Sequence, residues 1–244
     1  MLIIINKNML KLIIAVVLIA LVIAVGTILY NRTDDRAVMN MYEEMIPQPI
    51  DKGDQASDHI AFACNVDWGN EVIPEMLRVL EEKDVKITFF VTGRWAKSFP
   101  SEFQEIIKAG HEIGSHGYHH SDYSKLSLQE NKRQIQDSEE VIMKYTNVKP
   151  TLFAPPSGAF NENTLKAAEA LGYQTILWTI DTIDWRKDST KDVIIRRVVE
   201  RDDHGGAIIL MHPMPETAKA LPNLIEKMAE KGLNVGRVTD VLTK

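Results

Sequence analysis

From residue 58 onward, short apolar runs alternate with longer segments in which apolar residues recur every three or four positions. The short runs are bounded by turn residues and predict buried strands at residues 60–66, 87–91, 112–115, 151–154, 174–178 and 207–211. The longer segments predict amphipathic helices at residues 73–82, 101–109, 127–145, 161–171, 190–200 and 216–231. Strand and helix therefore alternate along this whole part of the chain.

The predicted helices carry recognisable end signals. Ser127 and Glu130 have the spacing of a capping box, and Gly110, Gly172 and Gly232 directly follow predicted helices. A strand followed by a helix, repeated along the chain, predicts parallel strands joined by crossover helices. The fold class is therefore α/β, and the pattern fits either a (β/α) barrel or an open doubly wound sheet.

A different pattern precedes this region, because residues 12–30 contain no charged residue. The run is long enough to cross a bilayer as a helix. Lys7 and Lys11 precede it, whereas the following flank mixes both signs of charge, so residues 1–11 are expected in the cytoplasm and the remainder outside. We favour a signal-anchor over a cleaved signal peptide, because the run is long and residues 27–30 make a poor cleavage site.

The segment between the apolar run and the first predicted strand, residues 31–57, is polar, contains Pro and Gly and shows no period, which predicts an extracytoplasmic linker. Residues 58–244 then form the folded domain. The chain has 244 residues, 45% of them apolar, and a net charge of -6, with no basic stripe that would attract nucleic acid. Cys64 is the only cysteine, so a metal would need His, Asp or Glu ligands.

Polar side chains gather at the ends of the predicted strands. In parallel α/β folds the carboxyl ends of the strands form one edge, where binding and catalytic residues lie. These positions are Asn65, Asp67, His116, Pro155, Pro156, Asp181, Asp184 and His212. The sequence therefore predicts one site at that edge.

The segment GSHGYHH places His116 and His120 directly after the strand at 112–115. If a helical turn begins there, residues four apart project from one face and both imidazoles can reach one ion. Asp67 would complete a set of two histidines and one carboxylate, which leaves open positions for water and substrate. By itself, this spacing fits a polar loop equally well.

Ordered motifs across residues 58–244 resemble carbohydrate esterase family 4, the NodB-homology polysaccharide deacetylases. The segments that carry the resemblance are AFACNVDWG, VKITFFVTG, GHEIGSHGYHH, APPSG, WTIDTIDW and AIILMH. The resemblance implies a distorted (β/α)7-type barrel, a divalent metal that is usually zinc, with cobalt as another possibility, and hydrolysis of acetyl groups on a glycan. It also implies that Asp67, His116 and His120 bind the metal and that the APPSG segment, with Pro155, Pro156 and Gly158, lines a substrate groove.

Amide hydrolysis needs a base for the attacking water and an acid for the departing amine. His212 follows the strand at 207–211 and is placed to act as that acid. Asp184 is the first candidate to hold His212, and Asp181 is the second. Aromatic rings near the strand ends, including Trp185 and Tyr118, are candidates for a sugar platform.

The chain departs from the family pattern at its first motif, where the family has an aspartate pair as base and metal ligand. One register puts Asn65 at the base position and Asp67 at the metal position; the other puts Asp67 at the base position and Trp68 at the metal position. The family's arginine partner of the base is Ala154 here. A buried charge without a partner is costly, so a chain that lacks the arginine is expected to lack the base carboxylate as well. This favours the register that puts Asn65 at the base position.

The expected function is that of a membrane-anchored, metal-dependent deacetylase that acts on a cell-envelope glycan, with peptidoglycan as the first candidate. An amide such as Asn65 cannot take a proton at neutral pH, so a glycan-binding pseudoenzyme of the same fold is the alternative. Asp67, Glu71, or a metal hydroxide together with His212 are possible substitutes for the base. An O-acetyl esterase is a further alternative, since an ester needs less assistance at the leaving group.

Overall fold

The computed structural model describes residues 9, 17–18, 20–27 and 46–242. The chain divides into two compact units, Met1–Ile46 and Pro47–Lys244. In the first unit, residues 17–18 and 20–27 are helical, while residues 12–16, 19 and 28–30 of the predicted membrane span lie outside the described residues. Among the residues that are described, no helix has both the length and the apolar character needed to cross a membrane.

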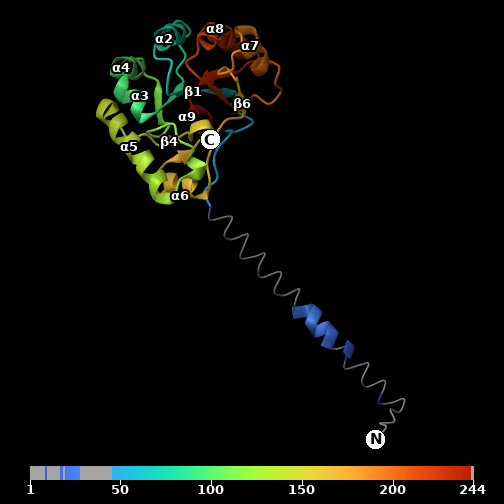
Figure 1. The fold of residues 1–244 in the computed structure, drawn as a ribbon. Coiled ribbons are helices and arrows are strands. Elements are labelled where there is room, and N and C mark those ends of the chain that lie inside the picture. Colours follow the sequence, from blue (N-terminus) through green and yellow to red (C-terminus); the bar gives the residue numbers. More distant parts are fainter. Residues whose placement is uncertain (1–8, 10–16, 19, 28–45, 243–244) are drawn as a thin grey trace. The chain divides into compact units, whose positions relative to one another are not determined.

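The second unit is built on one curled parallel sheet (Figure 1). Its strands follow the order β5-β4-β3-β2-β1-β7-β6, and β8 pairs with β1. The strand bounds are β1 His59–Val66, β2 Thr88–Val91, β3 Glu112–Ser115, β4 Leu152–Phe153, β5 Gln174–Thr175, β6 Ile180–Asp181, β7 Ile208–Met211 and β8 Asn234–Gly236. All the strand pairs are parallel, as the alternation of strands and helices predicts.

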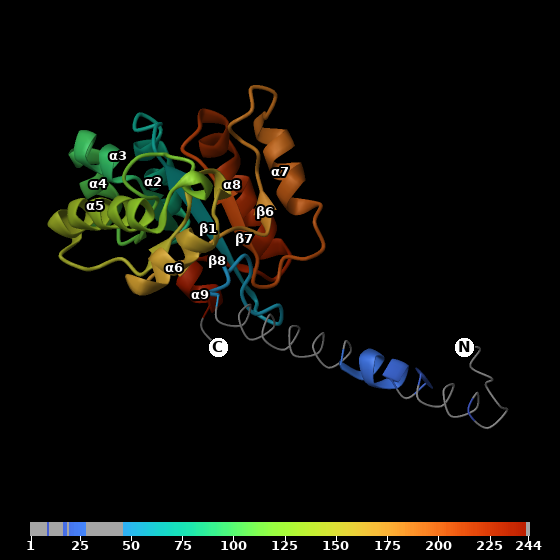
Figure 2. The same ribbon diagram turned by 60° about the horizontal axis from the view of Figure 1, so that its bottom comes forward.

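Helices surround the strands, with α2 to α5 on one side and α7 and α8 on the other (Figure 2). Their bounds are α2 Ile73–Glu82, α3 Gly93–Ser98, α4 Pro100–Lys108, α5 Leu128–Thr146, α6 Glu162–Ala170, α7 Lys191–Val199, α8 Pro215–Glu230 and α9 Val238–Leu242. Two 3-10 turns, Tyr123–Lys125 and Pro156–Gly158, lie in the loops. The capping box of Ser127 and Glu130 is confirmed, and Gly110, Gly172 and Gly232 have positive φ after α4, α6 and α8.

The two faces of the central strand β1 differ in side-chain size. Ile60, Phe62, Cys64 and Val66 join the large core beneath the outer helices. Ala61 and Ala63 face the interior of the curled sheet and pack in a smaller cluster that includes Ala154. Because side chains alternate along a strand, Asn65 continues the interior face at its carboxyl end. The strand thus carries this amide into the mouth of the curled sheet.

The predicted barrel is confirmed only in part, because the sheet curls without closing in the described residues. β5 and β6 are its two edges, and residues 176–179 connect them directly, without a crossover helix. Instead, Ile50 forms a parallel bridge with Ile176, and Lys52 forms an antiparallel bridge with Ala207. Residues 47–57, which were expected to be linker, therefore belong to the compact domain, because their backbone pairs across the open side of the sheet.

Candidate functional site

A pocket of about 370 Å³ opens at the carboxyl ends of the strands. Its walls come from β1, β3, β6 and β7 and the loops that follow them. The lining residues are Asn65, Trp68, His116, His120, Ser157, Trp178, Asp181, Trp185, Leu210 and His212. The structure thus brings together most of the polar strand-end residues that the sequence singled out.

The histidine pair lies in a bent loop after β3, and the predicted helical turn is wrong. Gly117 turns the chain with a φ of +72°, and a Cβ there would lie 1.9 Å from the Tyr123 hydroxyl. The rings of His116 and His120 still approach edge to face, with centroids 5.3 Å apart. The bend, rather than helical periodicity, brings these two imidazoles together.

His116 is buried and fixed in one orientation. Its Nδ1 donates to the Ala154 carbonyl at 2.6 Å, which leaves Nε2 as the nitrogen available to the pocket. Burial, reinforced by the neighbouring His120, lowers the pKa of His116 to about 3. A neutral imidazole with a free Nε2 is the form that binds a metal.

Asp67 makes contacts that the metal-site prediction did not anticipate. Its Oδ1 accepts from Thr92 Oγ1 at 2.7 Å and from Arg94 Nε at 2.8 Å, and its Oδ2 accepts from Arg94 Nη2. Although burial raises the pKa of Asp67, the hydrogen bonds from Arg94 and Thr92 hold this pKa below its ordinary value. Asp67 is therefore an anion whose two oxygens are both engaged.

The expected metal trio of Asp67, His116 and His120 is not assembled in this arrangement. Over the part of the chain that the structure describes, no three His, Cys, Asp or Glu side chains are grouped closely enough to hold a metal ion. The Asp67 carboxylate is instead held by Arg94, whose guanidinium donates to both of its oxygens. The described residues thus offer a metal the imidazoles of His116 and His120 but not the carboxylate of Asp67.

Asn65 faces the pocket and is almost fully buried, with 4% of its surface exposed. Its Oδ1 has no hydrogen-bond partner, which is unusual for a buried polar atom. Ala154, in the neighbouring interior cluster, has no polar side chain to offer Asn65; its carbonyl accepts from His116 and its N–H donates to the Ser115 carbonyl. The third candidate base, Glu71, is exposed and is not among the pocket residues.

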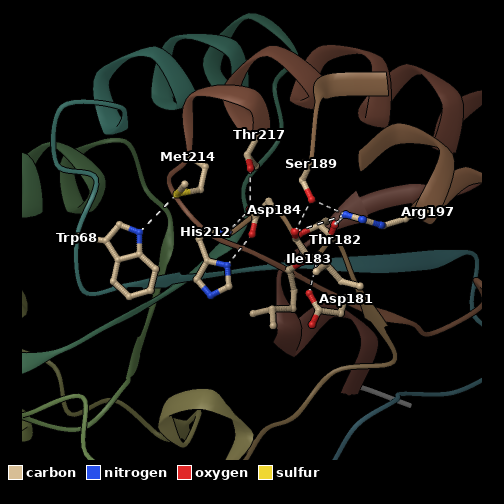
Figure 3. A network of polar contacts seen from close by, with 11 residues as sticks. Trp68, Asp181, Thr182, Ile183, Asp184, Ser189, Arg197, His212, Met214 and Thr217 are labelled. Atoms are coloured by element: carbon tan, nitrogen blue, oxygen red, sulfur yellow. Dashed lines mark hydrogen bonds and ion pairs between the residues drawn. The ribbon is translucent and has the colours of Figure 1, made fainter. Parts of the chain in front are cut away.

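His212 is held by the buried carboxylate of Asp184, as predicted (Figure 3). Nδ1 of the ring donates to Asp184 Oδ1 at 2.7 Å, and the backbone N–H of His212 donates to Oδ2 at 2.7 Å. Thr217 Oγ1 donates to the same Oδ2 at 2.6 Å. Asp184 is thus fully satisfied without solvent and fixes the ring of His212.

Asp181 has a separate role from Asp184. Its Oδ1 accepts from the backbone N–H of Ile183 at 2.7 Å, and burial raises its pKa. Ile183 has a φ of +51°, which is rare for a β-branched residue, and its carbonyl accepts from Ser189 Oγ. Arg197 donates to Ser189 Oγ at 2.6 Å and to the Thr182 carbonyl at 2.8 Å (Figure 3). These contacts hold the loop that carries Asp184.

Tryptophan rings form much of the pocket rim. Trp68 stacks on His212, with ring centroids 5.5 Å apart and planes 12° apart, and its Nε1 donates to Met214 Sδ at 3.5 Å. Trp185 is 55% exposed, and Trp178 packs against Gly158, where a Cβ would lie 2.6 Å from the indole. Exposed aromatic faces above polar groups suit the apolar faces and hydroxyls of a sugar.

Some predicted substrate residues lie away from the pocket. Tyr118 packs over Gly93, where a Cβ would lie 2.6 Å from its ring, so its position is dictated by the fold. Pro155 and Pro156 are buried beneath the loop, and Gly158 supports Trp178. Within the APPSG segment, Ser157 is the residue that lines the pocket.

Arg94 and Thr217 were not predicted as parts of the site, and Trp68 was considered only as the residue at the metal position in one register. Trp68 and Arg94 follow the ends of β1 and β2, so the rule that places functional residues at strand ends would have found both. Thr217 lies in the first turn of α8 and reaches Asp184 only through the fold. No local signal in the sequence indicates that contact.

Comparison with known proteins gives consistent matches. A family model for polysaccharide deacetylase matches residues 52–176. The uncharacterized Bacillus subtilis protein YlxY is 41% identical over 200 residues, which cover 82% of this chain and 62% of YlxY. The Bacillus subtilis peptidoglycan-N-acetylmuramic acid deacetylase PdaA is 31% identical over 72% of this chain and 68% of its own. This chain thus spans less than two thirds of YlxY.

A solved structure agrees with these sequence matches. BA3943 of Bacillus anthracis, a CE4 family pseudoenzyme, superposes with a TM-score of 0.78 at 41% identity, covering 82% of this chain and 71% of that one. A mutant of BA3943 with restored enzymatic activity superposes with a TM-score of 0.79 at 39% identity, covering 82% and 73%. The fold, the ordered motifs and the family match agree, and this chain belongs to the polysaccharide deacetylase family, carbohydrate esterase family 4.

Proposed function

We propose that this domain binds N-acetylated glycan strands of the cell envelope, such as peptidoglycan, and hydrolyses them slowly or not at all. The observation that carries the proposal is Asn65, a buried amide in the pocket whose Oδ1 has no partner. An amide does not accept a proton at neutral pH, so it cannot activate water as a carboxylate does. Asp67, the nearest alternative base, is paired with Arg94 and is not among the residues that line the pocket.

The chemistry of the pocket supports a glycan as the ligand. Trp68, Trp178 and Trp185 offer flat apolar surfaces, and Asn65 and His212 offer polar groups between them. The relative PdaA is named for a peptidoglycan sugar, which supports the same class of ligand here. The relative BA3943 is a pseudoenzyme at 41% identity, which supports the loss of hydrolysis.

Residual deacetylation is the second candidate function. It is favoured by the intact contact between His212 and Asp184, because a fixed imidazole is suited to protonate a departing amine. A divalent metal would supply activated water, and His116 and His120 would hold it. An O-acetyl ester would suit such a weakened site better than an amide, because an alkoxide can leave without protonation, whereas an amide nitrogen must be protonated before it leaves.

The test uses the purified full-length chain with acetylated chito-oligomers and peptidoglycan. Binding is measured calorimetrically, and acetate release is measured with and without added zinc or cobalt, on both amide and ester substrates. We expect binding without acetate release beyond that of a heat-denatured control. Absence of glycan binding would overturn the proposal, and repeated turnover by the unmodified chain would overturn its catalytic part in favour of the second candidate.

A gain-of-function variant tests the assignment of Asn65. Asn65→Asp together with Ala154→Arg restores the carboxylate and its arginine partner, and we expect acetate release to rise. The control is Asn65→Asp alone, which leaves the new carboxylate buried without a cation and should gain less. If both variants stay at the level of the unmodified chain, Asn65 does not occupy the base position.

We also propose that residues 12–30 anchor the domain on the outer side of the cell membrane. The support is their lack of charge and the lysines that precede them. Fractionation should place the chain with the membranes, and protease added to spheroplasts should digest the domain. Recovery in the soluble fraction, or a mature N-terminus beyond residue 30, would contradict the anchor.

A further inference from the structure

We infer that Arg94 prevents Asp67 from binding a divalent cation. In the structure the guanidinium occupies both oxygens of the carboxylate that would complete the histidine pair. Metal binding in this pocket would then require displacement of Arg94. The inference deepens the proposed function and rests on it for the identity of the pocket, but it concerns the cation rather than the glycan.

The contact between Asp67 and Arg94 is well supported by its surroundings. The Asp67 side chain is 4% exposed, so it has little access to water, whereas the Arg94 side chain is 49% exposed and approaches from the solvent side. Thr92 Oγ1 adds a third hydrogen bond to Asp67 and is itself fixed as the N-cap of α3, where it accepts from the Trp95 N–H. A buried carboxylate needs a cation nearby, and Arg94 provides it.

Arg94 is also tied to the loop that carries the histidine pair. Its backbone N–H donates to the Tyr118 carbonyl at 3.1 Å, and the Gly93 N–H donates to the Gly117 carbonyl at 2.9 Å. The start of α3 and the segment between His116 and His120 therefore share a fixed geometry. These two backbone hydrogen bonds fix Arg94 at a position from which its guanidinium group reaches Asp67. The contact is therefore supported by the backbone around Arg94.

A metal would meet two obstacles at this position. Hydrogen bonds from Arg94 and Thr92 occupy three of the roughly four lone-pair positions of the Asp67 carboxylate, and the guanidinium charge beside it opposes the binding of a divalent ion. Without Asp67, the site offers only the imidazoles of His116 and His120. Two neutral ligands hold a divalent ion much less tightly than two imidazoles with a carboxylate.

The experiment measures the affinity for Zn²⁺ and Co²⁺ in the absence of any glycan, by calorimetry and by the absorption spectrum of Co²⁺. Arg94→Gln removes the charge and the bidentate fork while keeping the side-chain stem as far as Cδ. We expect it to bind Zn²⁺ roughly tenfold or more tightly than the unmodified chain. The gain should disappear in Arg94→Gln with His116→Ala, which places the ion at the histidine pair.

Arg78→Gln is the matched control, since Arg78 forms an exposed ion pair with Glu82 at 2.5 Å and lies on the outer helix α2. It removes the same charge elsewhere and should leave Zn²⁺ affinity unchanged. An unchanged or lower affinity in Arg94→Gln would overturn the inference and make Arg94 a purely structural partner of Asp67.

A second variant keeps the inference testable even if Arg94→Gln does not fold. Arg94→Lys keeps a positive charge beside the buried Asp67 carboxylate but removes the bidentate fork, and it should bind Zn²⁺ more tightly than the unmodified chain, by less than Arg94→Gln. A Zn²⁺ affinity equal to or below that of the unmodified chain would overturn the inference. These measurements are independent of glycan binding and acetate release, so failure of the proposed function would be recognised separately.

Discussion

Asp184 holds His212 at two points, because one carboxylate oxygen accepts from the backbone N–H and the other from Nδ1, each at 2.7 Å. The carboxylate thereby fixes both the start of the loop after β7 and the orientation of the ring. Nε2 is left as the nitrogen that can face a ligand in the pocket. A single buried side chain thus couples the fold of this loop to the chemistry of the site.

The first prediction concerns the free energy of unfolding. Asp184→Ala leaves Thr217 Oγ1, the His212 N–H and Nδ1 without their acceptor, and we expect a loss of about 3 to 5 kcal/mol. Asp188→Ala is the control, because the Asp188 side chain is exposed and forms an ion pair with Arg186 at the surface, and it should cost far less. Denaturant unfolding measures both, and equal losses would contradict the role given to Asp184.

The second prediction concerns the turn that brings the two imidazoles together. Gly117 and Gly172 both have positive φ, but a Cβ on Gly117 would lie 1.9 Å from the Tyr123 hydroxyl, whereas a Cβ on Gly172 meets nothing within 4 Å. Gly172→Ala should therefore cost about 1 kcal/mol from backbone strain alone. Gly117→Ala should cost about 3 kcal/mol or more, because Tyr123 must move as well.

Denaturant midpoints compare these two glycine variants directly. In Gly117→Ala, NMR signals of His116 and His120 should also shift, since the loop that carries them is displaced. Equal stability of the two variants would mean that the loop can relax around the added methyl group.

Much of the fold was predictable because its signals are local. The bounds of α2 coincide with the predicted helix at 73–82, and Ser127 caps α5 as expected. The pattern left a barrel and an open sheet as alternatives, and the pairing of Ile50 with Ile176 was not predicted, because this contact joins residues far apart in the chain. The six-residue α3 was missed because it is too short for an amphipathic period to be seen.

The position of the candidate site was predictable, but the hydrogen-bond partners of its side chains were predictable only in part. Strand ends located Asn65, His116 and His212, which all line the pocket. Which carboxylate holds which partner depends on side-chain direction; the pairing of Asp184 with His212 was predicted, whereas that of Asp67 with Arg94 was not. The expected role of Tyr118 failed for the same reason, since its ring turns toward Gly93.

The third prediction concerns the pH dependence of stability. Burial lowers the pKa of His111 to about 4, below its ordinary 6.5, while its Nδ1 accepts from the Ile87 N–H. The unfolded chain therefore takes up a proton that the folded chain resists. The stability that His111 contributes is complete above pH 6.5 and is lost as the pH falls toward 4. Between pH 7 and pH 5 this loss amounts to about 2 kcal/mol.

His111→Gln tests this contribution, because a side-chain amide oxygen can still accept from Ile87 but does not titrate. Unfolding free energies at pH 7 and pH 5 should differ by about 2 kcal/mol less in the variant than in the unmodified chain. Other titrating groups, including His116, are common to both proteins and cancel in this comparison. An unaltered pH dependence would contradict the lowered pKa of His111.

The fourth prediction concerns Trp68, which stacks on His212 and is 39% exposed at the pocket rim. If the indole serves as a platform for a sugar ring, Trp68→Ala should weaken glycan binding by about tenfold, whereas Trp68→Phe should keep most of the affinity. Leu128→Ala is the matched control, since Leu128 is 37% exposed at the start of α5 and does not line the pocket.

Calorimetric titration with a chito-oligomer distinguishes binding from stability in these variants. Trp68→Ala should lower the free energy of unfolding by no more than roughly 3 kcal/mol, because the indole is 39% exposed and its two ring contacts are with His120 and His212, so the chain stays folded during the titration. The loss of affinity then reflects the missing platform and the altered surroundings of His212. Equal affinities of Trp68→Ala and Leu128→Ala would mean that the glycan lies elsewhere in the pocket, against Trp178 and Trp185 alone.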